Sequence, residues 1–401
     1  MRFCLAVPTY WTFPGGRDEG EIFFDHPTPL DQEGTLPRLL TSLVPLLSAE
    51  DHIVVVAAAT HDSLAGQTET RVRELLAAFT SQGSVHLFSS SHLAVFQDFC
   101  RQQGHPAFCS LLSLNGYGAI RNLTLVLANL LGARALVSLD DDEIITDAAF
   151  LARIEQDLHE LAHTFAVFGL AGLYETPQGA IVAPEPQGAW VEFWPKMRWL
   201  NEAVAALGAA PTLTLTPLAL GGNMVISREL GGSIPFDPLL PRGEDTDYVL
   251  NARLFGIPFF LDPQLRVVHD PPDKPHPVWK RLRQDLARFW YTRQKLLTIE
   301  PGHVPQPVTA ADFLPYPGRF LTAELELLAY RAHTVLALEY LEAGEAAAAR
   351  ETLRNLEVLR RGWPGPGVFQ TYYLFVQQWR RFQGWLATPE VRAGALEAIW
   401  G

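Results

Sequence analysis

The chain has 401 residues, of which 48% are hydrophobic and 19% charged, a composition typical of a globular protein with a large core. Its formal net charge of −13 argues against a nucleic-acid-binding protein, because such proteins normally present a basic face. The three cysteines are too few for a disulfide framework and no apolar stretch is long enough to span a membrane, so we expect a cytoplasmic protein.

The N-terminal part of the chain alternates between short apolar runs and segments with apolar residues at helical spacing. The runs predict buried strands at 2–7, 53–56, 85–88 and 135–139. The helical spacing predicts helices at 36–47, 67–80, 92–103 and 119–132. The Pro- and Gly-rich segment 11–35 is predicted to be a long loop. This alternation predicts an α/β fold with a mostly parallel, Rossmann-like sheet covered by helices on both faces.

The pattern changes after residue 300, and a chain of 401 residues is too long for one average domain. The proline-rich stretch 301–317 is predicted to be a linker, and 322–361 a helical hairpin broken at Gly344. Another helical segment is predicted after residue 367. We therefore expect one domain at 1–300 and an α-helical C-terminal domain at 301–401, whose helices offer a surface for a homo-oligomer.

Three consecutive carboxylates, Asp140, Asp141 and Asp142, directly follow the predicted strand 135–139. Negative charges at the exit of a buried strand are costly unless a cation lies among them, and Mg²⁺ or Mn²⁺ prefers carboxylate and phosphate oxygens. Alternation along a strand points Asp140 and Asp142 to one side and Asp141 to the other. Ligands of such sheets bind beyond the carboxyl ends of the strands, where the segment 8–10 should also lie. A solvated acidic loop is the alternative interpretation.

Four short motifs occur in order along the chain. The first runs from Asn115 to Asn122 and continues, after an apolar helix, into Ser138–Asp142. The others are the Gly-rich segment Gly221–Ser227, the Glu-Asp segment Arg242–Tyr248 and the segment Val267–His269. Together they resemble the donor, acceptor-side, catalytic and late metal-binding motifs of family 2-like GT-A glycosyltransferases. The resemblance covers roughly residues 1–295 and implies the GT-A fold of nucleotide-diphospho-sugar transferases, with a helical module after it.

The resemblance implies a metal-dependent glycosyltransferase, with hexosyl transfer expected, that moves a sugar from a nucleotide-diphosphate sugar to the hydroxyl of a saccharide or small molecule. It implies Mn²⁺ or Mg²⁺ bound by Asp140, Asp142 and His269. The residues expected to bind the donor lie at strand ends, at a helix start and in the Gly-rich segment: Pro8, Thr9, Tyr10, Asp62, Arg121, Asn122, Asp140, Asp141, Gly222 and Asn223. Asp245, beside Glu244, is the expected base of an inverting transfer, because one carboxylate raises the pKa of another.

The second predicted strand departs from the family's pattern. These enzymes usually place an aspartate after it that recognises the nucleotide base, whereas this chain has Ala57–Thr60 followed by His61 and Asp62. Asp62 is either that residue displaced along the chain, or the base is recognised differently. The identity of the nucleotide therefore stays open.

Several of these residues also have a structural interpretation. His269 fits a hydrogen-bonded loop histidine, Arg121 fits a partner for a carboxylate, and acidic residues at 244–247 favour a helix N-terminus. The three tryptophans between 190 and 199 fit either an acceptor platform or the core. The basic segment 280–295 fits either a helix beside the active site or a peripheral contact with an anionic membrane.

Other functions share parts of this pattern. Retaining GT-A transferases also carry a DxD-like motif and a histidine, so the stereochemical outcome stays open. A sugar-nucleotide pyrophosphorylase is disfavoured because 15–17 matches its phosphate loop poorly, and an oxidoreductase because 116–121 lacks the third glycine of a dinucleotide site. A non-catalytic GT-A scaffold acting through its helical C-terminal domain would have lost key side chains. Asp142, Asp245 and His269 are all present.

Overall fold

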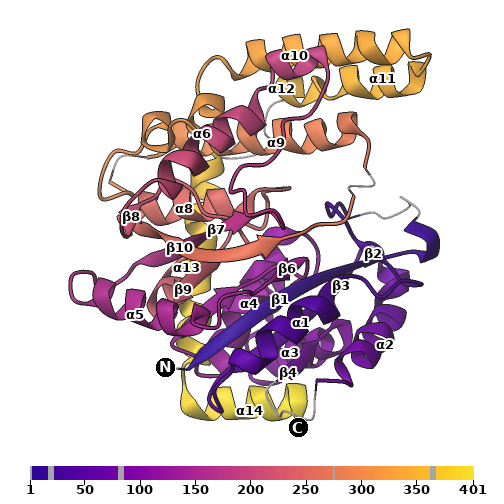
Figure 1. Ribbon diagram of the computed structural model, residues 1–401. Helices are drawn as coiled ribbons and strands as arrows, with labels where there is room; N and C mark the ends of the chain where they lie inside the picture. The colour runs from indigo at the N-terminus through magenta and orange to yellow at the C-terminus, as the bar shows by residue number, and fades with distance from the viewer. Residues whose placement is uncertain (1, 17–21, 80–84, 274–275, 301, 362–366) are drawn as a thin grey trace.

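The computed structural model of the chain describes residues 2–16, 22–79, 85–273, 276–300, 302–361 and 367–401. Within them, a single mixed sheet contains a path of strands in the order β4-β3-β1-β5-β9-β7-β10-β6, with β2 added to β1 and β8 to β10 (Figure 1). The strands are β1 (Phe3–Thr12), β2 (Thr28–Pro29), β3 (His52–Ala59), β4 (Val85–Phe88), β5 (Ala135–Ser138), β6 (Glu143–Ile144), β7 (Gly169–Glu175), β8 (Thr214–Leu215), β9 (Met224–Ser227) and β10 (Phe259–His269).

The N-terminal half of the sheet is parallel. β1 pairs in parallel with β3 on one side and β5 on the other, and β4 continues the parallel order beyond β3. In the other half, β9 runs antiparallel to β5 and β7, while β10 is parallel to β7. The predicted α/β fold with a mostly parallel sheet is confirmed. Since β3 and β5 lie on opposite sides of β1, the crevice at the carboxyl ends of these strands is the expected ligand position.

The prediction that the first strand ends at Pro8 is wrong, because β1 continues to Thr12. β5 pairs with β1 only from Phe3 to Ala6, whereas β3 accompanies β1 from Cys4 to Trp11. Pro8 therefore lies where the β5 side of the strand has no further ladder partner, and its missing N–H removes no hydrogen bond there. Part of the segment predicted as a loop is thus strand.

Alternating side chains of the strands build a core on each face of the sheet. Phe3, Leu5 and Val7 of β1 join one hydrophobic cluster, while Cys4 and Ala6 join the other. The first face is covered by α1 (Leu36–Leu43), α2 (Ala65–Leu76) and α5 (Phe150–Ala162). The second is covered by α3 (Ser90–Gln102), α4 (Tyr117–Leu130), α6 (Lys196–Gly208), α7 (Arg228–Ser233), α8 (Glu244–Leu254) and α9 (Val278–Leu297).

The C-terminal helices divide into two groups (Figure 1). α10 (Leu325–Glu342), α11 (Ala346–Arg354) and α12 (Glu357–Arg361) form a lobe that lies along α9. α13 (Val368–Leu386) runs back to pack against α4, α7 and α9, and α14 (Pro389–Trp400) packs against α3 and α4. The predicted helical C-terminal region is present. Its separation from residues 1–300 as a domain stays a prediction, since α13 and the sheet share one core cluster.

The stretch predicted to be a linker packs against the rest of the protein. Pro301 lies outside the described residues, but Val308, Phe313, Tyr316 and Phe320 are buried in the core cluster that contains α9. Prolines restrict the backbone of this segment, and its aromatic side chains bury it. In the described part of the chain, no helix combines the length and apolar content needed to cross a lipid bilayer.

Candidate active site

The aspartate triplet 140–142 lies where β5 leaves the sheet. A histidine at the end of β10 lies beside it. β6 pairs antiparallel with the end of β10, placing Glu143 opposite His269. His269 Nε2 lies 3.4 Å from Asp142 Oδ2. His26 Nε2, from the segment between β1 and β2, lies 3.3 Å from the same oxygen. Two imidazole rings from distant parts of the chain therefore meet at one carboxylate.

Asp142 is fully buried, with a relative exposure of 0%. Apart from the two histidine contacts, neither of its carboxylate oxygens has a hydrogen-bond donor among the described residues. Burial by itself would raise the pKa of Asp142, but the hydrogen bond and charge of His269, together with His26, hold it below its usual value. Asp142 is therefore an ionised carboxylate with unused coordinating capacity.

The two neighbouring acids, Asp141 and Glu143, are held inside the protein. Thr9 Oγ1 on β1 donates to Asp141 Oδ2 at 2.6 Å. Burial, followed by the charge of Asp142, raises the pKa of Asp141 to about 8, and burial raises that of Glu143 well above its usual value. Thr9 and Asp141 thus tie β1 to the triplet, and their contact with each other leaves them poorly placed for the donor contacts predicted for them.

Position 222 has to be a glycine because Glu143 packs against it. A Cβ at position 222 would come 1.9 Å from Glu143 Oε1, so any side chain there would collide with the buried carboxyl group. The other oxygen, Oε2, accepts the backbone N–H of Asp140 at 3.1 Å. The Gly-rich segment therefore allows its backbone to approach the triplet closely.

Arg121 on α4 connects the triplet to the predicted catalytic motif. Its Nη2 donates to Asp140 Oδ1 at 2.5 Å, its Nη1 to Ser138 Oγ at 2.5 Å, and its Nε lies 3.5 Å from Glu244 Oε1. The guanidinium is 3% exposed, and the carboxylates keep its pKa above the usual value in spite of burial. The structure thus gives Arg121 carboxylate partners, while Asp140 keeps 28% of its side chain exposed beside it.

Tyr174, at the end of β7, joins three parts of the site. Its hydroxyl donates to Asp140 Oδ2 at 3.2 Å and accepts the backbone N–H of Gly222 at 2.6 Å. Its ring stacks on His269 with the ring centroids 4.5 Å apart. Tyr174 therefore fixes the orientation of His269 and of Asp140 together.

Asp245 lies in the first turn of α8, next to the Gly-rich segment. Its Oδ2 accepts the backbone N–H of Gly221 at 3.2 Å, and its Oδ1 accepts that of Thr246 at 2.6 Å. Its neighbour Glu244 has a pKa raised to about 7 by burial and then by the charge of Asp245, against the lowering effect of Arg121. The structure brings both acids to the triplet through Arg121 and Gly221.

A pocket of about 290 Å³ lies at the carboxyl end of β3. It is lined by Asp62, by Ala57 and Ala59 of β3, and by residues 113–115 before α4. Tyr10 lies closer to the triplet, stacked on Phe24, and the buried oxygen of its hydroxyl has no hydrogen-bond partner among the described residues. Asp62 thus faces a cavity of the size that a nucleotide base needs.

Two predicted donor-binding residues have other roles. The side-chain amide of Asn122 donates to the backbone carbonyl of Phe236 at 2.9 Å and accepts its N–H at 2.8 Å. Asn223 donates to the carbonyls of Leu173 and Leu265 at 3.1 and 3.0 Å, bridging β7 and the β10 segment. Because both amides are buried and bonded to the backbone, we no longer expect them to contact the donor.

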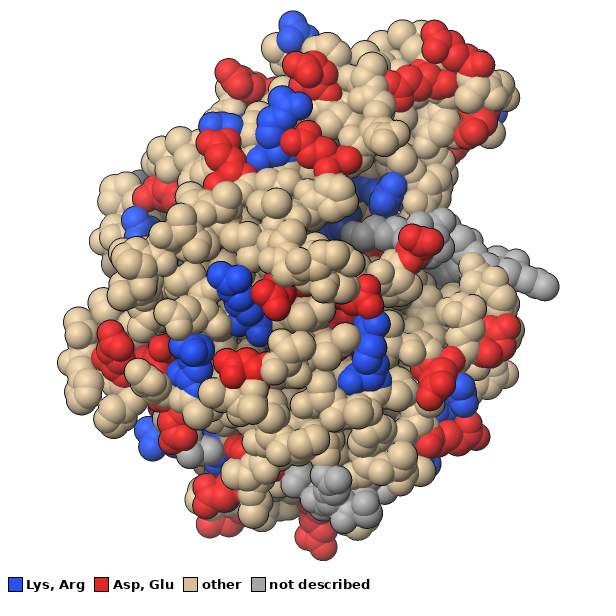
Figure 2. Space-filling view, viewed as in Figure 1, with Lys and Arg blue, Asp and Glu red and all other residues tan. Residues whose placement is uncertain are grey.

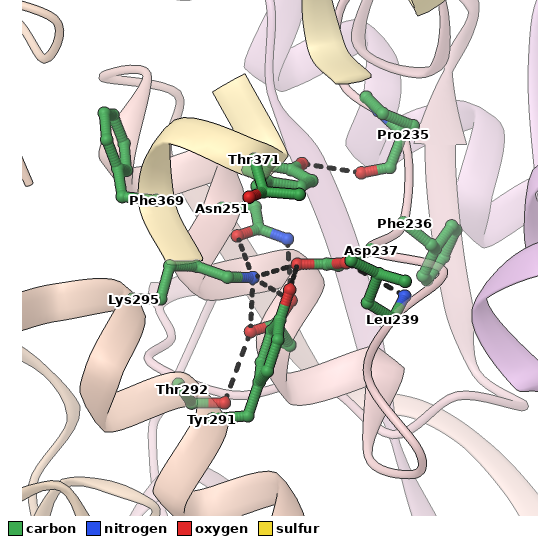
Figure 3. Close-up of polar contacts among 12 residues, drawn as sticks. Pro235, Phe236, Asp237, Leu239, Asn251, Tyr291, Thr292, Lys295, Phe369 and Thr371 are labelled. Atoms are coloured by element: carbon green, nitrogen blue, oxygen red, sulfur yellow. Dashed lines mark hydrogen bonds and ion pairs between the residues drawn. The ribbon is translucent and has the colours of Figure 1, made fainter. Parts of the chain in front are cut away.

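Asp247, two residues after Asp245, belongs to a separate buried cluster (Figure 3). Lys295 Nζ on α9 donates to Asp247 Oδ2 at 2.7 Å and to Asn251 Oδ1 at 3.0 Å, and lies 2.9 Å from Asp237 Oδ2. Tyr291 donates to Asp237 Oδ2 at 2.9 Å. Lys295 is 0% exposed, so this cluster is closed to solvent. Asp247 thus lies in the first turn of α8, as acidic residues there favour, and its carboxylate is paired with a buried lysine.

The aromatic and basic segments also lie mostly inside. Trp190 and Trp194 are buried in the core cluster, and Trp199 packs against Phe320, so a tryptophan platform for the acceptor is not formed. On α9, Arg288 and Lys295 are buried. A helix that buries these cations does not present them to a membrane surface.

Two residues of the site, His26 and Tyr174, were missed from the sequence. His26 lies in the segment predicted as a loop, 116 positions before Asp142, and no local pattern connects the two. Tyr174 is the penultimate residue of β7, and its place at the carboxyl end of a strand next to β10 was the available signal.

In the described part of the chain, no group of three or more His, Cys, Asp or Glu side chains is arranged to hold a metal ion. The side chains alone therefore do not form a closed metal site. Mg²⁺ and Mn²⁺ sites commonly consist of one or two side chains completed by substrate phosphates and water. Asp142 and His269 fit that open type of site.

No protein-family model matches the chain, and neither does any curated protein. Among solved structures, the mannosyltransferase PcManGT from Pyrobaculum calidifontis, in complex with GDP-Man and Mn²⁺, has a TM-score of 0.47 and 14% identity, covering 97% of this chain and 87% of its own. TarS 1–349 of S. aureus has a TM-score of 0.46 and 15% identity, covering 90% and 92%. Glucosyl-3-phosphoglycerate synthase from Mycobacterium tuberculosis, with Mn²⁺ and UDP-Glc, has a TM-score of 0.37 and 15% identity, covering 72% and 78%.

The solved structures to which the chain is similar thus include a mannosyltransferase with GDP-Man and Mn²⁺ bound.

Proposed function

We propose that the chain is a metal-dependent glycosyltransferase that transfers a sugar from a nucleotide-diphosphate sugar to a hydroxyl acceptor, with inversion at the anomeric carbon. The observation that carries this proposal is Asp142. It is a fully buried, ionised carboxylate at the carboxyl edge of the sheet, in contact with two histidine nitrogens and with no further donor among the described residues. A buried charge of this kind is costly unless a cation completes its surroundings.

The residues at this position fit Mn²⁺ or Mg²⁺. Asp142 and His269 would hold the ion, and the diphosphate of the donor would supply oxygens that the protein does not. Such an ion, when bound, stabilises negative charge on the diphosphate leaving group as a Lewis acid. His26 and Tyr174 keep the two ligands in place through their contacts with Asp142 and His269.

The donor side of the site is built by β1, β3 and the start of α4. We assign the base to the pocket that Asp62 lines, and the ribose and phosphates to the side of Asp140 that stays exposed. Arg121 holds Asp140 in position and places one buried positive charge behind it. Tyr10 closes this side with its stacked ring.

Asp245 is assigned as the base on the acceptor side. Its two backbone hydrogen bonds, from Gly221 and Thr246, fix the carboxylate at the end of the Gly-rich segment. In that position it would accept the proton of the attacking hydroxyl. Glu244 stays paired with Arg121 and holds the α8 turn against the donor side.

Calorimetry with UDP and GDP, in Mn²⁺ and in EDTA, tests the proposal. We expect binding of one nucleotide that is much weaker in EDTA, because an acidic site and an anionic diphosphate repel each other without a cation. Asp142→Asn should lose the dependence on Mn²⁺, whereas Asp147→Asn, a change at an exposed residue of the following loop, should keep it. Equal affinity in Mn²⁺ and EDTA would contradict the metal role of Asp142.

A screen of nucleotide sugars by thermal shift then identifies the donor, since stabilisation is expected only from the sugar nucleotide that binds the native state. The matching donor is used for transfer assays. Absence of stabilisation by any nucleotide sugar with Mn²⁺ present would count against the enzyme class itself.

A further inference from the structure

A group of cations lies beside the proposed base and has no part in the function proposed above. It consists of Lys196 at the start of α6, Arg242 directly before α8, and Arg288 on α9, and is called the basic cluster below. Lys196 Nζ donates to Asp285 Oδ2 at 2.7 Å. Arg242 Nη1 and Arg288 Nε lie 3.5 and 3.2 Å from the other oxygen of Asp285. All three cations thus converge on one carboxylate.

The basic cluster has more positive than negative charge in the described part of the chain. Apart from Asp285, it is paired with Asp25, which contacts Arg242. Three cations therefore share two carboxylates. This local excess of positive charge is unusual in a chain whose formal net charge is −13. Like charges buried this close together repel strongly, so the cluster favours an additional anion.

The pKa values of its members point the same way. Burial, with Arg242 and Arg288 acting against Asp285, lowers the pKa of Lys196 to about 7. Burial would raise the pKa of Asp285, but Lys196, Arg288 and Arg242 hold it at about 2. Asp285 is surrounded by cations, whereas Lys196 has too little negative charge near it to offset its burial.

The basic cluster can be reached from solvent. Lys196 and Arg242 keep 17% and 14% of their side chains exposed, whereas Asp285 keeps 5%. Figure 2 shows a hollow below the lobe formed by α10 to α12, with some Lys and Arg side chains in it. Asp285 is thus enclosed, while Lys196 and Arg242 each keep part of the side chain exposed, where an anion can reach them.

The cluster is also next to Asp245 in the chain and in space. Arg242 precedes Asp245 by three positions. Between them, Gly243 has φ of 73°, and a Cβ there would come 2.0 Å from Arg288 Nη1. The guanidinium of Arg288 therefore packs against the turn that leads into α8, one residue from the Glu-Asp pair. A ligand bound by the cluster would lie beside the proposed base.

We propose that the acceptor carries an anionic group, phosphate or carboxylate, which the basic cluster binds while the acceptor hydroxyl lies at Asp245. This inference rests on the proposed function and specifies the acceptor class for the same site. Guanidinium and ammonium groups form charge-assisted hydrogen bonds with phosphate and carboxylate, and the guanidinium fork matches both geometries.

Matched pairs of acceptors test this proposal. Transfer from the identified donor is measured to a neutral sugar and to the same sugar bearing a phosphate, and to glycerol and glycerol 3-phosphate. We expect kcat/KM to favour the anionic member by about 10- to 100-fold, the range expected for one or two charge-assisted contacts. Lys196→Gln and Arg242→Gln should reduce this preference, whereas Arg319→Gln, in a surface pair with Glu202, should not. Equal use of neutral and anionic acceptors would overturn the proposal while leaving the transferase function intact.

The source of the anion is distinguished by a second acceptor format. Vesicles of phosphatidylcholine with phosphatidylinositol are compared with the soluble phosphates and with pure phosphatidylcholine vesicles. Transfer confined to the mixed vesicles assigns a lipid headgroup, and transfer to the soluble phosphates assigns a free metabolite. Both results support an anionic acceptor, and transfer to neither, with neutral sugars accepted, contradicts it.

A binding measurement separates the failure of this inference from the failure of the proposed function. Inorganic phosphate is titrated into the protein by calorimetry, with and without Lys196→Gln, after thermal unfolding shows that the variant is folded. If no donor binds and no transfer occurs, the proposed function is overturned. Phosphate binding that Lys196→Gln weakens by about 10-fold or more would still establish the anion site. If the wild-type protein does not bind phosphate, the anion site is overturned as well.

Discussion

Two groups of buried carboxylates meet at the first turn of α8, and they differ in how their charge is balanced. In one, Lys295 satisfies Asp237 and Asp247 with direct bonds and excludes solvent (Figure 3). In the other, Asp142 is as deeply buried but meets only two histidines among the described residues. The first cluster is complete within the protein. In the proposed function, a bound cation completes the second, and this difference separates a structural acid from a proposed functional one.

Two acidic residues in one turn of α8 face the two groups. Asp245 and Asp247 are two positions apart, and successive helix residues are rotated by about 100°, so their side chains leave α8 in widely different directions. Asp245 turns to Gly221 and the site, and Asp247 turns to Lys295. Two identical side chains in one turn therefore have different partners.

The largest effect is expected from Asp245→Asn, which keeps the shape of the side chain and removes its basicity. The value of kcat should fall by about 10²- to 10⁴-fold, the usual contribution of a positioned base. Donor affinity should change little, because the lost interaction belongs to the transition state. Steady-state kinetics and calorimetry check both parts.

The matched change on the same helix, Asp247→Asn, should lower stability and leave the pH profile of kcat unaltered. The product's anomeric configuration, measured by NMR coupling constants, provides an independent check. Retention, or an Asp245→Asn variant with near wild-type kcat, would remove the base assignment.

Lys295→Met tests the closed cluster. Removing one partner of a buried ion pair leaves uncompensated charge, here on Asp237 and Asp247, and should cost about 3–5 kcal/mol of unfolding free energy. Urea denaturation measures this loss. If the unfolding free energy of the variant is within about 1 kcal/mol of the wild-type value, the cluster does not stabilise the fold.

Glu244 should make the free energy of unfolding depend on pH. Its pKa is raised to about 7, chiefly by burial, so the folded state binds its proton more tightly than the unfolded state does. Its contribution to stability is therefore present below the unfolded pKa, near 4.5, and is lost as the pH rises through about 7. Glu244→Gln should flatten this decline, by at most about 3 kcal/mol. Urea titrations at several pH values measure the slope, and an unchanged slope would contradict the assignment.

Asp142→Asn should have the smallest effect on stability and should selectively lower the affinity for the metal ion. The change removes the desolvation cost of a buried charge and also its favourable contacts with His269 and His26, so the two effects offset and the unfolding free energy should stay within about 1 kcal/mol of the wild type. Affinity for Mn²⁺ with nucleoside diphosphate, measured by electron paramagnetic resonance, should fall by at least about 10-fold. A large loss of stability would place Asp142 with the structural acids.

Much of the donor half could be predicted because its signals are local. The strand at 85–88 was predicted with the bounds of β4, and the triplet was correctly placed at a strand exit. The end of β1 was missed because the effect of Pro8 depends on how far β5 accompanies it, and pairing is not written in the strand itself. His26 was missed for a similar reason, since only the folded chain brings it to Asp142.

The motif residues show the limit of resemblance. Asn122 lies in the donor motif and Asn223 in the Gly-rich acceptor-side motif, yet both amides are bonded to the backbone. An amide carries the same four hydrogen-bonding groups in either role, and burial decides which partners it finds. Neither the spacing nor the residue type distinguishes the two roles.

Trp400 of α14 contacts the edge strand β4. Trp400 Nε1 donates to the backbone carbonyl of Leu87 on β4, an edge strand, at 2.8 Å across 313 positions of sequence. During synthesis at about 5–20 residues per second, β4 waits roughly 15–60 s for this partner to leave the ribosome. Unpaired edges readily join other chains. Until synthesis reaches α14, the carbonyl of Leu87 lacks this partner.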